Sequence, residues 1–139
     1  MTPRQIKLVQ ASFAQVRPIA ATAAELFYNR LFSLDPALRP MFKGDIARQG
    51  QMLMSMIGAA VLGLGNLERL APVVRDLGAR HAGYGVRTEH YATVGAALLW
   101  TLEQGLGPQF TDEVREAWTA AYGLLSDVMQ LGAMEAASA

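Results

Sequence analysis

The sequence contains no cysteine, which excludes disulfide bonds, thiolate nucleophiles and iron–sulfur ligation by this chain. An excess of one charge is also lacking, because twelve basic residues balance twelve acidic ones and neither kind forms a long run. The chain therefore lacks the basic patch that nucleic acid or an anionic membrane attracts. No apolar run reaches membrane-spanning length, since Ser55, Gly58 and Gly63 interrupt the longest one. We expect small neutral partners, with no nucleic acid and no membrane.

The 139 residues, 52% of them hydrophobic, suffice for one core that also encloses a cofactor. We expect a single domain over residues 1–139, with a mobile tail of small residues after about residue 132. Thr2 and Pro3 read as an N-cap and a first-turn proline, with Gln5 at the capping-box position. This pattern predicts a folded helix start instead of a secretory leader, so we expect a soluble, cytoplasmic protein.

Apolar residues recur at helical spacing through almost the whole chain, and no stretch alternates with period two for long enough to indicate a strand. The sequence therefore predicts an all-α protein. The first helix is expected to end near residues 17–18, the second to span about 20–32, and a short segment to run from 36 to about 41. Four further helices are expected to begin after the N-caps Asp45, Asn66, Thr88 and Thr111.

His81 is the most informative residue, because it continues the apolar face of Leu70, Val73, Val74 and Leu77 just before the helix is expected to break. An imidazole on such a face needs a partner. No cysteine, second histidine or carboxylate lies nearby on that face, so we do not expect a zinc site made of local ligands. Two interpretations remain from the residue alone: an axial ligand of a large group such as haem, or a core histidine bonded to a backbone carbonyl.

Several motifs then occur in one order along the chain. Residues 28–32 read YNRLF and are followed by Asp35-Pro36 and Phe42, a series that resembles the B helix, C helix and CD corner of the globin family. Residues 77–81 read LGARH, which is similar to the globin proximal segment. Residues 77–132 resemble neuroglobin-like and bacterial single-domain globins, whereas the distal residues look like those of flavohaemoglobins. The resemblance covers essentially the whole chain and implies a globin fold of about seven to eight helices, in a 3-on-3 arrangement around one haem b.

The resemblance implies a role for ten residues. His81 is the expected proximal ligand of the haem iron, with its other ring nitrogen donating to a carbonyl near Leu77. Tyr28 and Gln49 are expected to donate hydrogen bonds to a gas bound on the distal side. The alternative, in which Tyr28 and Gln49 bond each other or the backbone, stays open at this point. The other residues expected to contact the haem are Phe42, Leu53, Leu77, Val86, Tyr91, Val94 and Leu98.

One departure from the flavohaemoglobin pattern concerns the proximal side. In that family a tyrosine ten residues after the proximal histidine and a glutamate on the last helix make the imidazole a stronger donor to iron. Tyr91 matches the tyrosine, but Ala133 stands at the glutamate position and Glu135 lies two residues further on. This departure weakens the expectation of peroxidase-like chemistry, and it makes nitric oxide dioxygenation less secure than oxygen binding.

The resemblance implies a haem-b globin that binds O2, NO and CO. Its expected use is oxygen binding, or conversion of NO to nitrate with an external reductase. Two other functions stay open: a haem-based gas sensor that acts through a partner protein, and a haem-free helical module that binds an apolar ligand or another protein.

Overall fold

The computed structural model describes residues 1–138, and the regular structure of this part is entirely helical. The prediction of an all-α protein is therefore confirmed. Short 3₁₀ segments cover Arg17–Ile19, Pro36–Met41 and Gly107–Gln109. The α-helices are α1 (Pro3–Val16), α2 (Ala20–Leu34), α3 (Ile46–Gly63), α4 (Leu67–Gly83), α5 (Thr88–Leu106) and α6 (Asp112–Ser138). None of the helices within residues 1–138 is long and apolar enough to cross a membrane.

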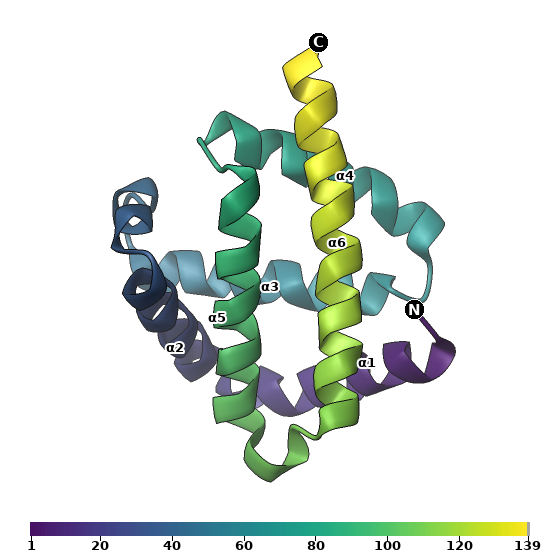
Figure 1. The fold of residues 1–139 in the computed structure, drawn as a ribbon. Coiled ribbons are helices and arrows are strands. Elements are labelled where there is room, and N and C mark those ends of the chain that lie inside the picture. Colours follow the sequence, from purple (N-terminus) through teal and green to yellow (C-terminus); the bar gives the residue numbers. More distant parts are fainter. Residues whose placement is uncertain (139) are drawn as a thin grey trace.

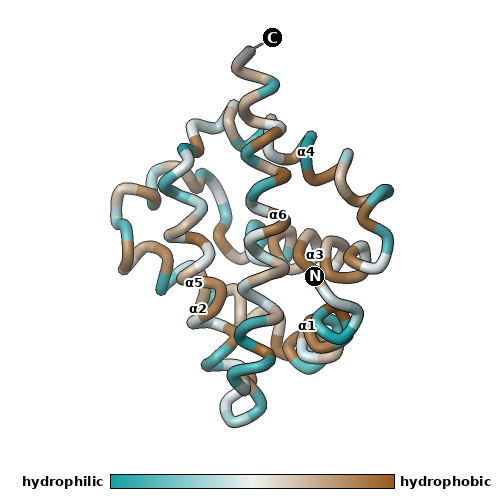
Figure 2. The backbone as a smooth tube through the Cα atoms, turned by 45° about the vertical axis from the view of Figure 1, so that its right-hand side comes forward, coloured by the Kyte–Doolittle hydropathy of each residue, from teal (hydrophilic) through white to brown (hydrophobic). Residues whose placement is uncertain are grey.

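The helices cross in two sets. Figure 1 shows α5 and α6 running alongside each other in front, while α1 and α3 run across behind them. α2 packs against both α3 and α5, and α4 packs mainly against α6. Hydrophobic and hydrophilic positions succeed each other along α6 in Figure 2, as expected for a helix that buries one side.

The described residues form six α-helices, fewer than the seven to eight expected, and the difference arises between α2 and α3. The segment Pro36–Met41 closes as a 3₁₀ helix, and its two prolines supply no backbone N–H for an α-helical ladder. Asp45 follows shortly, and its side chain accepts a hydrogen bond from the backbone N–H of Ala47 at 3.0 Å. This cap starts α3 directly after the loop, so no further helix fits between them.

The last helix is longer than the sequence indicated. α6 runs to Ser138, although we expected helical order to end near Gly132. Ala133, Ala136 and Ala137 follow that glycine, and alanine is the strongest helix former. Gly132 itself is buried, so this part of α6 packs against the rest of the molecule.

Most predicted helix starts are confirmed by their hydrogen bonds. At the start of α1, the Thr2 hydroxyl accepts from the Gln5 backbone at 3.1 Å while the Gln5 side chain accepts from the Thr2 backbone at 3.0 Å. Thr111 likewise accepts from a backbone N–H in the first turn of α6, at 3.2 Å. The expected cap of α5 is wrong by one residue, because Arg87 occupies the N-cap position and Thr88 is the first helical residue.

The core forms two clusters of buried side chains. The larger includes Phe13 of α1 and Trp118 of α6, and the smaller joins α2 to α5 through Phe27, Leu31 and Ala97. Within the larger cluster, the Trp118 indole N–H donates to the Ser12 hydroxyl at 2.8 Å. Both side chains are buried, so this hydrogen bond satisfies a donor that water cannot reach.

Replacing Ser12 by alanine is expected to destabilise the fold by about 1–3 kcal/mol, because the buried Trp118 N–H loses its acceptor. Urea unfolding followed by tryptophan fluorescence measures the change in the free energy of unfolding. Ser33→Ala, at an exposed position of α2, is the control and is expected to change stability by less than about 0.5 kcal/mol. Equal unfolding midpoints for the two variants would contradict this account of the core.

Candidate functional site

His81 lies near the end of α4, where its ring is half-buried. Its Nδ1 is 2.8 Å from the backbone oxygen of Leu77, one turn earlier, so the hydrogen bond expected from the sequence is present. A carbonyl only accepts, which means that Nδ1 carries the proton and Nε2 keeps its lone pair. Within residues 1–138 no side chain or backbone group bonds Nε2. The imidazole is therefore oriented and leaves one nitrogen available to an iron atom.

Two rows of apolar side chains are left partly uncovered by protein. On α4, Val73 and Leu77 precede His81 at intervals of four residues, and Val73 is 62% exposed. On α3, Met56 continues the face of Leu53, and it is 38% exposed. Exposed apolar surface of this kind is stabilised when a flat apolar group covers it.

The predicted distal residues gather around an aromatic cluster. The ring of Tyr28 meets the ring of Phe42 edge-on, with centroids 5.3 Å apart, and Phe32 contacts both rings. The structure brings five of the predicted site residues together here: Tyr28, Phe42, Leu53, Val94 and Leu98. Burial raises the pKa of the Tyr28 hydroxyl, which keeps it protonated as a hydrogen-bond donor. That hydroxyl has no hydrogen-bond partner in the described part of the chain.

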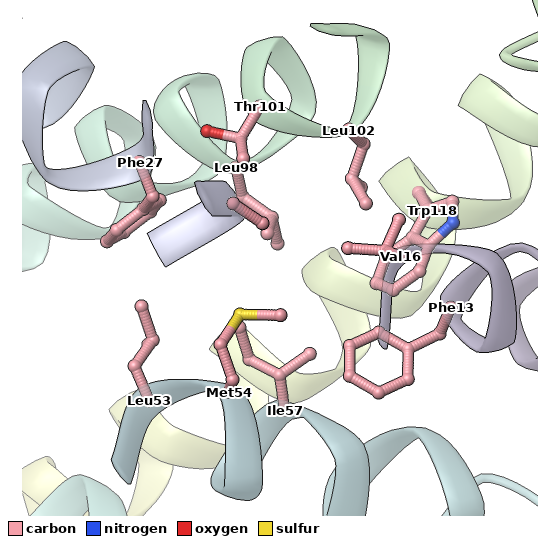
Figure 3. Close-up of a pocket in the computed structure, with 11 residues that line it drawn as sticks. Phe13, Val16, Phe27, Leu53, Met54, Ile57, Leu98, Thr101, Leu102 and Trp118 are labelled. Atoms are coloured by element: carbon pink, nitrogen blue, oxygen red, sulfur yellow. The ribbon is translucent and has the colours of Figure 1, made fainter. Parts of the chain in front are cut away.

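Leu53 also borders a small internal cavity of about 20 Å³. Figure 3 shows Leu53 facing Phe27 and Leu98 across this space. Thr101 contributes a polar atom to the wall, but its hydroxyl donates to a carbonyl of its own helix at 2.8 Å. Leu53 therefore borders both the aromatic cluster and this apolar cavity.

Gln49 has a different arrangement. The residue is half-buried, and its side-chain amide donates to the backbone oxygen of Lys43 in the loop before α3. No hydrogen bond joins Gln49 to Tyr28. This geometry corresponds to the backbone-bonded alternative left open by the sequence, so the amide must leave the Lys43 carbonyl before it can reach a bound ligand.

Two hydrogen bonds to backbone oxygens fix the segments that carry the residues expected on the proximal side. The backbone N–H of Val86 donates to the backbone oxygen of His81 at 3.1 Å, so the loop after α4 folds back on the histidine. Tyr91, 8% exposed, is held by the Tyr122 hydroxyl, which donates to the Tyr91 backbone oxygen at 2.6 Å. Burial, with a smaller contribution from Tyr91, raises the pKa of the Tyr122 hydroxyl far above its ordinary value.

Tyr122 was not predicted as a site residue, although the sequence contains a signal for it. It lies four residues after the buried Trp118, on the inward side of α6. Its ring packs where Gly95 has no side chain, since a Cβ there would lie 2.7 Å from a ring carbon. Because Gly95 on α5 has no side chain, the Tyr122 ring of α6 has room to pack against it.

Replacing Tyr122 by phenylalanine is expected to lower the free energy of unfolding by about 1 kcal/mol, because the variant loses the bond to the Tyr91 carbonyl. The carbonyl belongs to α5 and keeps its helical partner, so the loss stays near the value for one ordinary hydrogen bond. Thermal unfolding measures the effect. Tyr84→Phe, at a position 70% exposed, is the control, and an equal change in both variants would contradict the role of Tyr122.

Within the described residues, no carboxylate bonds the His81 ring as the flavohaemoglobin pattern would require. Glu135 is exposed, and its carboxylate lies 3.5 Å from the guanidinium of Arg75. Ala133 is half-buried and has no polar side chain. Within residues 1–138 the hydrogen-bond partner of the His81 ring is therefore a carbonyl, which donates less electron density than a carboxylate.

His90, the other histidine, lies in the first turn of α5. The residue is half-buried, and its Nδ1 accepts from the backbone N–H of Arg87 at 2.9 Å. His90 thus occupies the third position of α5 and caps the helix, a place usually taken by glutamate or glutamine.

The arrangement defines what kind of metal group fits. No group of three or more histidine, cysteine, aspartate or glutamate side chains in the described residues is placed to hold a metal ion. A metal at His81 must therefore bring its own ligands, and a flat apolar macrocycle matches the uncovered rows on α3 and α4. The fold and site together define an all-helical protein in which a histidine with a free ring nitrogen follows a partly uncovered apolar row.

A family model for globins matches residues 25–129. The chain therefore belongs to the globin family. Among curated relatives, flavohemoproteins of Bordetella parapertussis and Rhizobium meliloti are 33% and 32% identical to it over 132 residues, which is 93% of this chain. The chain spans about a third of the length of these relatives, 33% in both cases.

Solved structures support the same fold. A bacterial globin from Campylobacter jejuni superimposes with a TM-score of 0.88 at 26% identity, covering 99% of this chain and 100% of the globin. An engineered carbene transferase from Rhodothermus marinus, named as a candidate nitric oxide dioxygenase, gives a TM-score of 0.88 at 25% identity. That match covers 99% of this chain and 96% of the other.

Proposed function

We propose that this chain binds haem b through Nε2 of His81 and binds O2, NO and CO on the opposite side of the haem. One observation carries the proposal: the His81 ring is fixed by the Leu77 carbonyl and keeps a free nitrogen at the end of the partly uncovered apolar row on α4. Membership in the globin family supports haem as the group that fits there.

When bound, haem supplies a redox-active iron with an open position for a diatomic gas. His81 holds that group, and its bond to Leu77 sets the ring plane and keeps the proton on Nδ1. Leu77, Val86 and Tyr91 line the proximal side. Val94 and Leu98 lie beneath the haem on that same side, whereas Phe42 and Leu53 pack against the other side.

Tyr28 and Gln49 are the proposed donors to the gas. The buried Tyr28 hydroxyl keeps its proton and has no competing partner among the described residues, so it is free to donate. Gln49 becomes a second donor when its amide leaves the Lys43 carbonyl. Donors at this place stabilise a ligand that carries partial negative charge, which favours O2 over CO.

The proposed use is oxygen binding or conversion of NO to nitrate. Relatives named flavohemoprotein and a structural neighbour named as a candidate nitric oxide dioxygenase support the second use. Joining NO and O2 into nitrate requires one electron per turnover. We propose that a reductase outside residues 1–139 supplies this electron.

Absorption spectra of the purified protein test the proposal. We expect the reduced protein to be five-coordinate, to form a long-lived O2 complex in air, and to convert NO to nitrate when that complex meets NO. Nitrate measured by ion chromatography should match the NO consumed. Absence of a Soret band after haem addition would contradict haem binding, and a stable O2 complex that yields no nitrate would restrict the function to oxygen binding.

A further inference from the structure

The helix that carries His81 crosses α6 with almost no space between the two backbones. A Cβ atom on Gly78 of α4 would lie 1.9 Å from the backbone oxygen of Met129 in α6. A Cβ atom on Gly132 of α6 would lie 1.9 Å from the backbone oxygen of Arg75 in α4. Each helix thus contributes one glycine and one carbonyl, and the two contacts lie at neighbouring points of one crossing.

These glycines are required for close approach and not for an unusual backbone conformation. The glycines with positive φ are Gly44, Gly85 and Gly107, so Gly78 and Gly132 have ordinary helical geometry. Any side chain at either position must push the helices apart by about 1 Å or more, because the obstacle is backbone and cannot rotate away. Figure 1 shows α4 crossing behind the upper half of α6 at this place.

The crossing is close to the proposed iron ligand. Gly78 precedes His81 by three residues, which is about 4.5 Å along the helix axis. The imidazole is bonded to the carbonyl of Leu77, the residue next to Gly78. Any shift of the backbone at Gly78 therefore carries the imidazole with it.

Apart from the loop after α4, whose Val86 N–H donates to the His81 backbone oxygen, α6 is the element that fixes this end of α4. The helix ends at Gly83, and Gly85 follows with a φ of +91°, so the chain beyond His81 turns into a loop. α6 is the main neighbour of α4, whereas α3 contacts α4 much less. The close contact between α4 and α6 therefore fixes the position of the helix that carries His81.

We propose that Gly78 and Gly132 are positioning residues that set the distance and tilt of His81 relative to the haem iron. The inference rests on the proposed haem ligation by His81. A methyl group at Gly78 displaces α4 from α6, which strains the bond between Nε2 and iron and weakens it. At Gly132 the displacement acts further from His81, because the facing residue Arg75 lies six residues, about 9 Å, before the histidine.

The test is the iron–histidine stretching band of the reduced, five-coordinate protein, measured by resonance Raman spectroscopy. We expect Gly78→Ala to move this band to lower frequency and Gly132→Ala to move it in the same direction by less. Gly123→Ala on α6 and Gly83→Ala on α4 are matched controls, because a Cβ at either position meets nothing within 4 Å. Both controls should leave the band at the wild-type frequency.

A second arm separates positioning from general destabilisation. In a His81→Gly background, free imidazole ligates the haem without a covalent link to α4, so adding Gly78→Ala should leave the iron–imidazole band unchanged. A lowered melting temperature with an unshifted band in Gly78→Ala would overturn the inference. If Gly78→Ala does not fold, Gly132→Ala carries the same test from α6. A wild-type protein that binds no haem would instead contradict the proposed function, which keeps the two failures distinct.

Discussion

His81→Ala is expected to abolish stable haem binding, with the Soret band lost when the protein passes through a gel-filtration column. The reason is that His81 is the proposed iron ligand, since the Leu77 carbonyl fixes its ring and leaves Nε2 without a partner in the described residues. His81→Gly with added imidazole should restore the band, because the vacated space admits the free ligand.

His90→Ala is the matched control for this loss. The chain has two histidines, and His90 is used as a helix cap instead of facing the apolar rows. Its replacement should weaken the start of α5 by about 1 kcal/mol while haem binding persists. Haem that stays bound in His81→Ala and is released in His90→Ala would show that the assignment of the two histidines is reversed.

Tyr28→Phe is expected to speed O2 dissociation roughly 10- to 100-fold, since a hydrogen bond to a ligand with partial charge contributes about 1.5–3 kcal/mol. The ring is retained, so its contacts with Phe42 and Phe32 persist and the fold should be unaffected. CO carries less charge than O2 when bound, and its dissociation should change much less. Laser photolysis and stopped-flow mixing measure both rates.

Gln49→Ala should have a smaller effect than Tyr28→Phe, because the Gln49 amide already has a partner in the Lys43 carbonyl and must give it up. Tyr84→Phe, at an exposed position, is the control and should leave both gases unaffected. An unchanged O2 dissociation rate in Tyr28→Phe, with a large increase in Gln49→Ala, would reverse the proposed importance of the two donors.

Local signals in the sequence were sufficient for most of the helical framework. Capping residues such as Thr2, Asp45 and Thr111 act on backbone groups within three residues, so their effect can be inferred without knowing the fold. Helical spacing likewise predicted the apolar face of α4, although Val73 on that face is exposed, and the bond from His81 to Leu77 follows from helical geometry. The extension of α6 beyond Gly132 was missed because a glycine usually ends a helix, whereas here it is buried against α4.

The remaining features depend on contacts between residues far apart in the chain. Tyr122 bonds the Tyr91 backbone across 31 positions, and the glycine crossing joins Gly78 to Met129. Helical spacing places Tyr122 on the inward side of α6, but no local pattern in the sequence reveals the partner in either contact. The side chain of Gln49 could not be placed from the sequence for a related reason. Its position on α3 predicts the direction of the Cβ atom. The flexible side chain, however, adopts the rotamer that bonds the Lys43 carbonyl in the preceding loop.

Titration of the purified chain with haem tests the central claim most directly. Absorbance at the Soret band should rise linearly and saturate at a single haem per chain, and the reduced product should be five-coordinate with an imidazole ligand. Under the same conditions His81→Ala should show no saturable binding. A wild-type titration without saturation, or an equal titration in His81→Ala, would contradict the account of this chain as a haem-binding globin with His81 as its iron ligand.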